Sequence, residues 1–277
     1  MNGSEVRRKL RRGAYVVPTS LTVLNVLFGF ITILLCLQAS RSMAMGNTLK
    51  ASHLFRMACG ALVIAAVFDT FDGLVARLMK ATSEFGKEYD SLADCVTFGC
   101  APAVLVYTWS LQLWSRLGAG IAFLFLVAGS LRLARFNINT AKTDHRYFVG
   151  LPIPAGALTL ASIINYAPDP VTDKRFAAIM MLVTTGLAFA MVSTIRYRSQ
   201  KYANLQKRLS ATYVLIGVLM VAVLWRWPSE FFFLWMISYV SSGPLIKLWT
   251  IAFPSRRVPP PAPSFLPSSA EITVSDG

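Results

Sequence analysis

The chain has 277 residues, of which 55% are hydrophobic and only 14% charged, and its mean hydropathy is +0.54. Apolar runs that match the ~30 Å hydrocarbon layer of a bilayer recur along it, which excludes a soluble globular protein. The formal net charge of +14 does not indicate a nucleic-acid partner, because most Lys and Arg residues stand at the ends of apolar runs. This distribution favours a lipid bilayer with anionic headgroups as the partner, and no nucleic acid.

The apolar runs predict an all-α integral membrane protein with about eight transmembrane helices, because lipid offers no partners for unpaired backbone groups. The expected spans cover residues 20–38, 54–78, 91–110, 117–138, 152–168, 176–195, 211–227 and 229–247. A basic segment, residues 1–16, precedes them. Residues 254–277 are rich in Pro and Ser without an apolar period, which predicts a disordered tail.

The basic residues also predict the orientation. If the N-terminus is cytoplasmic, twenty Lys and Arg residues fall on the inner side and seven on the outer side. Cytoplasmic segments of membrane proteins carry the excess of positive charge. We therefore expect a multi-pass protein of the cell (inner) membrane with both termini in the cytoplasm.

Four aspartates stand in this apolar background. Asp69 and Asp72 are three residues apart in the second expected span, and Asp90 and Asp94 are four apart in the next. At ~100° per residue, each pair shares one face of its helix. The connection of about ten residues between the helices is short enough to make them antiparallel neighbours. We expect the four carboxylates to meet near the cytoplasmic ends of both helices.

Such a cluster requires cations. One ionised aspartate in mid-span costs roughly 2.5–3.5 kcal/mol, and four together also repel one another. Two divalent cations would neutralise them, and hard oxygen ligands favour Mg²⁺ or Mn²⁺. Two metals ~3.5–4 Å apart suit the clamping of a phosphoryl group. A divalent-cation transporter is the alternative from another class, although Arg77 on the acidic face argues against an ion pathway.

The residues around the acids resemble the signature of the CDP-alcohol phosphatidyltransferases: Asp69-x-x-Asp72-Gly73-x-x-Ala76-Arg77, eight residues, then Gly86-x-x-x-Asp90-x-x-x-Asp94. The resemblance implies a six-helix core and the transfer of a phosphatidyl group from a CDP-linked lipid to an alcohol, with release of CMP. It implies that Asp69, Asp72, Asp90 and Asp94 bind two metals and that Asp94 is also the catalytic base. It implies a CDP-lipid pocket formed by Gly73, Ala76, Arg77, Gly86, Thr22 and Asn25.

Further stretches resemble one branch of that family, the membrane-embedded phosphatidylserine synthases. They are PTSLTVLNVLFGF (18–30), SLADCVTFGCAPA (91–103), RLARFN (132–137), GLPIPAGA (150–157) and MVSTIRYRS (191–199). Thr19 departs from the Asn that many members carry. The branch implies CDP-diacylglycerol and L-serine as substrates. We expect a catalytic core over residues 17–200 and two additional helices within 201–253, which carry no acid except Glu230 and would serve as scaffold or as the surface of a homodimer.

The carboxylate of serine needs a cationic partner, and Arg132 and Arg135, followed by Asn137, are the candidates. The alternative interpretation is the ordinary basic belt at the cytoplasmic end of a helix. Other acceptors within the family stay open: glycerol phosphate, inositol phosphate, or serine on an archaeal ether lipid, as in an archaetidylserine synthase.

Overall fold

In the computed structural model, the described residues are 3–78, 84–139, 147–193, 196–198 and 228–252. They are helical apart from one short ribbon and the connections. In chain order the elements are α1 (Gly3–Ala44), α2 (Thr48–Leu78), α3 (Glu84–Asp94), the π-helix η1 (Cys95–Cys100), α4 (Ala101–Trp109), the 3₁₀-helix η2 (Leu111–Trp114), α5 (Ser115–Asn139), β1 (Tyr147–Val149), α6 (Ile153–Tyr166), α7 (Lys174–Val192), β2 (Arg196–Arg198) and α9 (Pro228–Ala252).

The structure confirms the all-α membrane class. Within the described ranges, five segments are long and apolar enough to cross a bilayer: Ser20–Ala44, Thr48–Gly73, Glu88–Trp109, Leu111–Ile138 and Lys174–Val192. The fifth expected span is the shorter apolar helix α6, and the eighth falls within α9. The seventh expected span, 211–227, and the predicted tail, 254–277, lie outside the described residues.

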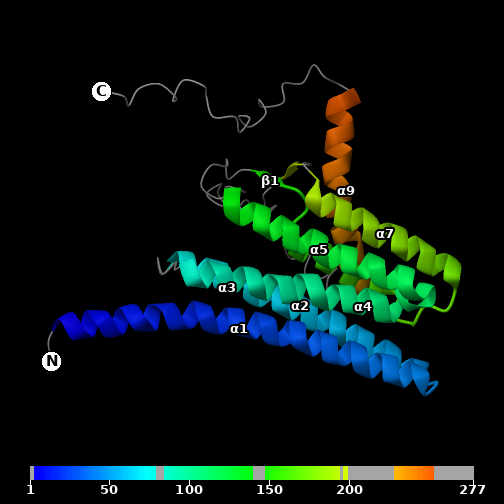
Figure 1. Cartoon of the computed structure of the whole chain (residues 1–277), viewed down its shortest axis with the longest axis horizontal. Helices are drawn as coiled ribbons and strands as arrows, with labels where there is room; N and C mark the ends of the chain where they lie inside the picture. Colours follow the sequence, from blue (N-terminus) through cyan, green and yellow to red (C-terminus); the bar gives the residue numbers. More distant parts are fainter. Residues whose placement is uncertain (1–2, 79–83, 140–146, 194–195, 199–227, 253–277) are drawn as a thin grey trace, which may run out of the picture.

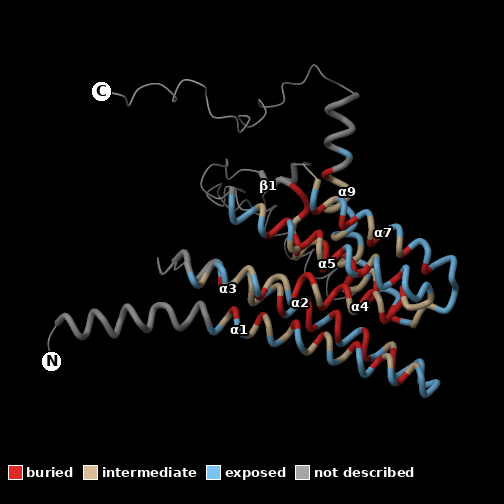
Figure 2. The backbone as a smooth tube through the Cα atoms, viewed as in Figure 1, coloured by how far each residue is buried: buried red, intermediate tan, exposed pale blue. Residues whose placement is uncertain are grey.

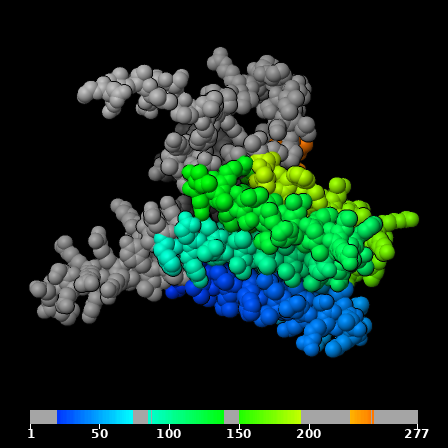
Figure 3. Space-filling view, in the orientation of Figure 1, coloured from blue at the N-terminus to red at the C-terminus, as the bar shows by residue number. Residues whose placement is uncertain are grey.

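The long helices run in one general direction and pack in layers, whereas α9 runs across them and extends beyond α7 (Figure 1). In the space-filling view, α1, the α3–α4 segment, α5 and α7 form successive bands on one face (Figure 3). The buried residues follow the inner faces of these helices (Figure 2). The largest fully buried side chains include Trp109, Phe55, Phe98 and Phe125, so an aromatic core holds the layers together.

The third expected span is not one regular α-helix. It consists of α3, the π-helix η1 and α4, and η1 begins immediately after Asp94. A π-turn widens the backbone locally and is frequent at functional sites. Within η1, Thr97, Phe98 and Gly99 are buried. The sequence periodicity did not predict this change of helix type.

A second feature absent from the sequence prediction is the antiparallel ribbon of β1 and β2, in which Phe148 pairs with Tyr197. Gly150 follows β1 with φ +83°, a conformation that favours glycine. A Cβ at Gly150 would lie 2.4 Å from the carbonyl oxygen of Met191 in α7. Next to it, the amide of Leu151 donates to the carbonyl of Ala190 at 3.0 Å. The turn into α6 is thereby fastened to the end of α7.

Candidate active site

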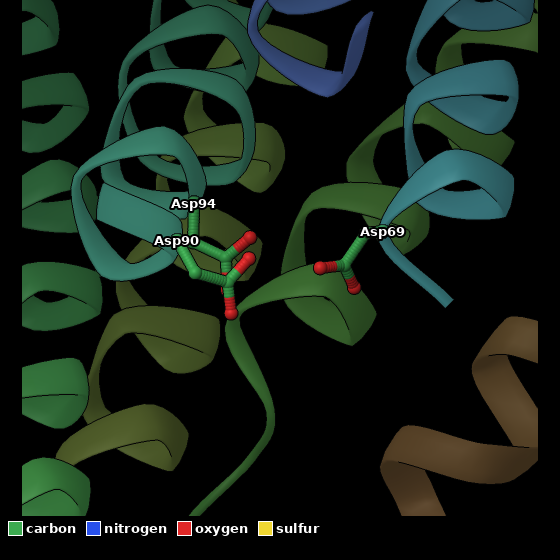
Figure 4. A group of neighbouring side chains, drawn as sticks. All are labelled: Asp69, Asp90 and Asp94. Atoms are coloured by element: carbon green, nitrogen blue, oxygen red, sulfur yellow. The ribbon is translucent and has the colours of Figure 1, made fainter. Parts of the chain in front are cut away.

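Three carboxylates from two helices come together at one end of the bundle. Asp69 of α2 and Asp90 and Asp94 of α3 each offer an oxygen, and these oxygens all lie within 4.8 Å of one another. The carboxylates of Asp90 and Asp94 lie side by side, and that of Asp69 points toward them from the facing helix (Figure 4). All three residues are half-buried. The short α2–α3 connection therefore brings together three of the four predicted metal ligands.

The fourth aspartate has a different partner. Asp72 is buried and accepts a hydrogen bond from the hydroxyl of Thr22 in α1. Asp72 is near enough to the cluster to interact electrostatically with Asp90. It therefore stands beside the three clustered carboxylates, and its position is set by α1.

Helix α1 also positions Asp94. Gly29 lets α1 approach η1 closely, because a Cβ at Gly29 would lie 2.8 Å from the Cα of Thr97. Across this contact, Thr97 donates from its hydroxyl to the carbonyl oxygen of Asn25 at 3.2 Å. The side-chain amide of Asn25, which is fully buried, lies 3.5 Å from Asp94 Oδ1. A chain of contacts from Gly29 through Thr97 thus fixes Asn25 against the acids.

The chemistry of these donors fits divalent cations. Asp69 and Asp90 both act electrostatically on Asp94 as like charges, and among the side chains that the structure describes Arg132 is the cation that acts on it. One guanidinium does not balance a group of carboxylates, whereas hard divalent cations take carboxylate oxygens as ligands. In addition, the buried Oδ1 of Asn25 has no hydrogen-bond partner among the described residues. This oxygen is a further neutral acceptor at the edge of the cluster.

The residues predicted to line the CDP-lipid pocket are placed in part. Gly73 is exposed on α2, and a Cβ there would meet nothing within 4 Å. Gly86 is half-buried in α3. Ala76 and Arg77 lie in the last turns of α2, but their side chains are outside the described set. A Cβ at Gly73, next to Asp72, would thus meet no described atom, and a residue without a side chain at this point suits close approach of a ligand.

The three residues predicted to bind serine have separate surroundings. Arg132 is only 8% exposed, and it interacts electrostatically with Asp94. Its Nε has no hydrogen-bond partner in the described part of the chain. Arg132 is therefore the member of this group that lies near enough to the acids to interact with Asp94.

Arg135 and Asn137 make contacts between helices. Arg135 donates from Nη1 to the carbonyl of Val192 at 3.1 Å and from Nη2 to that of Ser193 at 3.2 Å, at the C-terminus of α7. Asn137 donates from Nδ2 to the hydroxyl of Ser91 in α3 at 2.9 Å. A cation at a helix C-terminus stabilises the unpaired carbonyls there. These contacts favour a scaffolding role for Arg135 and Asn137.

Sequence reasoning did not single out Gly29 or Thr97. Both stand in stretches on which the family resemblance rested, PTSLTVLNVLFGF and SLADCVTFGCAPA. The resemblance therefore marked the two stretches, but it did not show that they contact each other. That contact, between α1 and η1, is seen only in the tertiary structure.

Comparison with known proteins gives a consistent set of similarities. The family model described as CDP-alcohol phosphatidyltransferase matches residues 15–192. A relative from Helicobacter pylori is 35% identical over 198 residues, which cover 70% of this chain and 80% of the relative. One from Methanocaldococcus jannaschii is 35% identical over 193 residues, covering 70% and 78%. One from Bacillus subtilis is 37% identical over 129 residues, covering 47% and 67%.

All three relatives bear the name CDP-diacylglycerol–serine O-phosphatidyltransferase. The family match begins within α1 and ends at the last residue of α7, so that it contains every carboxylate of the cluster. Helix α9 lies beyond it.

Proposed function

The chain belongs to the CDP-alcohol phosphatidyltransferase family, and we propose that it transfers the phosphatidyl group of CDP-diacylglycerol to the hydroxyl of L-serine, releasing CMP. The names of the relatives support this choice of substrates. The observation that carries it is the position of Arg132, a buried cation that interacts with Asp94 of the acidic cluster. An acceptor with a carboxylate and a reacting hydroxyl would bridge such a pair.

On the donor side, Asp69, Asp72, Asp90 and Asp94 would hold two divalent cations, Mg²⁺ or Mn²⁺. When bound, these cations would offset the negative charge of the diphosphate and of the departing CMP. Gly73, which presents no side chain beside Asp72, together with Ala76, Arg77, Gly86, Thr22 and Asn25, would accommodate the cytidine and the diphosphate. Thr97 holds the main-chain carbonyl of Asn25, and the side-chain amide of Asn25 extends from there toward Asp94.

On the acceptor side, Arg132 orients serine through its carboxylate. The serine hydroxyl gives its proton to the carboxylate of Asp94, and its oxygen attacks the phosphorus that bears the diacylglycerol. The bond from this phosphorus to the oxygen of the cytidylate breaks, and CMP leaves with the bonding electrons. The reaction is then a direct displacement at phosphorus, which needs one general base and no covalent intermediate on the enzyme.

For the domain boundaries, the orientation in the membrane and the assembly, we propose what the sequence predicts. We place the catalytic core at residues 17–200, between the basic segment 1–16 and additional helices within 201–253, in the inner membrane of the cell. The active site would face the cytoplasm, as would both termini, with anionic headgroups around the basic helix ends. Donor lipid would enter from the bilayer and serine from the cytoplasm. The protein would act as a homodimer.

A product assay tests the function. Purified protein is given CDP-diacylglycerol, a divalent metal and, in separate reactions, serine, glycerol 3-phosphate or inositol phosphate, and the lipid product is identified by mass. We expect CMP release and a phosphatidylserine product with serine alone. Product from another acceptor and none from serine would overturn the assignment. Mn²⁺ flux across the membrane of liposomes that contain the protein, without CMP release, would instead indicate a transporter.

A further inference from the structure

Asn25 of α1 places a fully buried amide beside the acidic cluster of Asp69, Asp90 and Asp94. Its Nδ2 lies 3.5 Å from Asp94 Oδ1. The other end of the amide, Oδ1, is buried and has no hydrogen-bond partner among the described residues. A buried acceptor without a partner costs free energy, so it indicates a ligand that completes it.

The main chain at Asn25 is held in place by η1. Thr97 donates from its hydroxyl to the carbonyl oxygen of Asn25 at 3.2 Å. About one turn farther along α1, a Cβ at Gly29 would lie 2.8 Å from the Cα of Thr97, so the two helices touch through their main chains. Because η1 begins immediately after Asp94, the same helix contact spaces Asn25 from Asp94.

The surroundings favour a cation as the partner of Asn25 Oδ1. The carboxylates of Asp69, Asp90 and Asp94 are acceptors when ionised, as the amide oxygen is. Two acceptors repel each other, whereas a hard divalent cation takes carboxylate and carbonyl oxygens together. The oxygen is buried, which favours a small ion over a nucleotide or an amino acid.

A neutral ligand also suits the charge of the site. Two divalent cations carry as much positive charge as the four carboxylates of Asp69, Asp72, Asp90 and Asp94 carry negative charge. A fifth carboxylate would leave an unbalanced negative charge in an apolar surrounding, which is costly. An amide oxygen adds a ligand without adding charge.

We propose that the side-chain oxygen of Asn25 is a ligand of one of the divalent cations at the acidic cluster. Rotation about the bond from Cβ to Cγ exchanges the oxygen and the NH₂ group without changing the shape of the side chain, so either end can face the cluster. Helix α1 thus supplies a metal ligand, and Asn25 serves the diphosphate of the donor through the cation it holds. This inference rests on the metal-dependent reaction proposed above.

The first experiment uses the full-length wild type in detergent, loaded with Mn²⁺ and labelled with ¹³C at Cγ of asparagine. Electron–nuclear double resonance of the bound Mn²⁺ detects a ¹³C nucleus next to a ligand oxygen. We expect a ¹³C coupling that is lost in Asn25→Asp and retained in Asn137→Ser, which removes the asparagine that is bonded to Ser91 in α3. A wild type that binds Mn²⁺ without this coupling would overturn the proposal, and so would a coupling that disappears in Asn137→Ser.

The second experiment separates a metal ligand from a residue that only donates to Asp94. Dissociation constants for Mn²⁺ are measured without substrate, from the paramagnetic resonance signal of the free ion. Asn25→Leu should raise the Kd about tenfold or more. Asn25→Asp keeps an oxygen but loses the N–H donor, and it should bind Mn²⁺ at least as tightly as the wild type. Thr32→Val, a buried change in α1 at a residue that bonds to the main chain, should leave the Kd unchanged.

Weaker Mn²⁺ binding in both Asn25 variants would show that Asn25 acts as a donor to Asp94, and an unchanged Kd in both would exclude contact with the ion. Either result would overturn the proposal. If neither variant folds, as judged by melting, the ¹³C coupling in the wild type and in Asn137→Ser decides.

Failure of the proposed function is distinguishable, because these measurements need no substrate. A wild type that binds Mn²⁺ through Asn25 but forms no phosphatidylserine would leave the ligand assignment intact and overturn the function. A wild type that binds no Mn²⁺ would overturn the metal site and this inference with it.

Discussion

Thr22 of α1 donates a hydrogen bond to the carboxylate of Asp72 in α2, and both side chains are buried. The bond joins residues fifty positions apart and ties the first helix to the acidic face of the second. Asp72 thereby has one oxygen fixed before any ligand arrives, while Asp69, Asp90 and Asp94 face one another. The site therefore contains one aspartate held by a hydrogen bond from α1 and three aspartates whose carboxylates lie close to one another.

Replacing Thr22 by Val should weaken metal binding and stability together. The change keeps the shape of the side chain but leaves a buried carboxylate with one fewer donor, at a cost of about 1–3 kcal/mol. The measurements are the melting temperature in detergent and the Mn²⁺ concentration that gives half-maximal activity. Thr32→Val is the control, because Thr32 is equally buried but donates to the backbone carbonyl of Phe28. Equal effects in both variants would contradict a specific role for the Thr22–Asp72 bond.

Asp94→Asn should abolish serine-dependent CMP release, because an amide cannot accept the proton of the hydroxyl. Loss of a general base costs typically 10²–10⁴-fold in rate. Binding of labelled CDP-diacylglycerol should be largely retained, and this is measured on the same preparation. Asp169→Asn is the control, since Asp169 is exposed and bonds to Ser52 away from the cluster. Near-normal turnover in Asp94→Asn would exclude Asp94 as the base.

Removal of divalent cations should stop the reaction, and Mg²⁺ or Mn²⁺ should restore it. The reason is the convergence of Asp69, Asp90 and Asp94 within 4.8 Å, which is unfavourable for three carboxylates unless cations lie between them. Asp90→Asn removes one charge from this group, and we expect it to raise the Mn²⁺ requirement by at least about tenfold. Activity that persists after chelation, with no metal in the protein by elemental analysis, would refute the metal site.

Gly29→Ala should destabilise the protein and lower its activity. The added Cβ would lie 2.6 Å from Thr97 Oγ1 and 2.8 Å from Thr97 Cα, so α1 and η1 would have to separate. Overpacking of this kind costs typically about 1–3 kcal/mol. Gly60→Ala in α2 is the control, since a Cβ there meets nothing within 4 Å and Ala favours the helix. A melting temperature of Gly29→Ala at or above that of Gly60→Ala would contradict the close contact.

The helical fold and the neighbourhood of the acids could be predicted from sequence because both depend on local patterns. Long apolar runs require helices, and the spacing of Asp69 from Asp90 across a short connection places them on adjacent helices. The π-turn after Asp94 could not be predicted, because the pattern of buried side chains in Cys95–Cys100 is set by tertiary contacts with α1 and α5. The hydrogen bond from Thr22 to Asp72 could not be predicted either. The two residues are fifty positions apart, and nothing in the sequence indicates that they are in contact.

Arg132 and Arg135 stand three residues apart in one helix, and their substitution should have opposite consequences. Arg132→Ala should raise the serine KM far more than that of CDP-diacylglycerol, because Arg132 is a buried cation that interacts electrostatically with Asp94. Arg135→Ala should instead lower the melting temperature and leave the serine KM nearly unchanged, because Arg135 donates to the carbonyls of Val192 and Ser193 at the end of α7. Steady-state kinetics and melting of both variants separate these effects. Equal rises of both KM values in Arg132→Ala would indicate a role toward the diphosphate, and a serine-specific defect in Arg135→Ala would return Arg135 to the acceptor site.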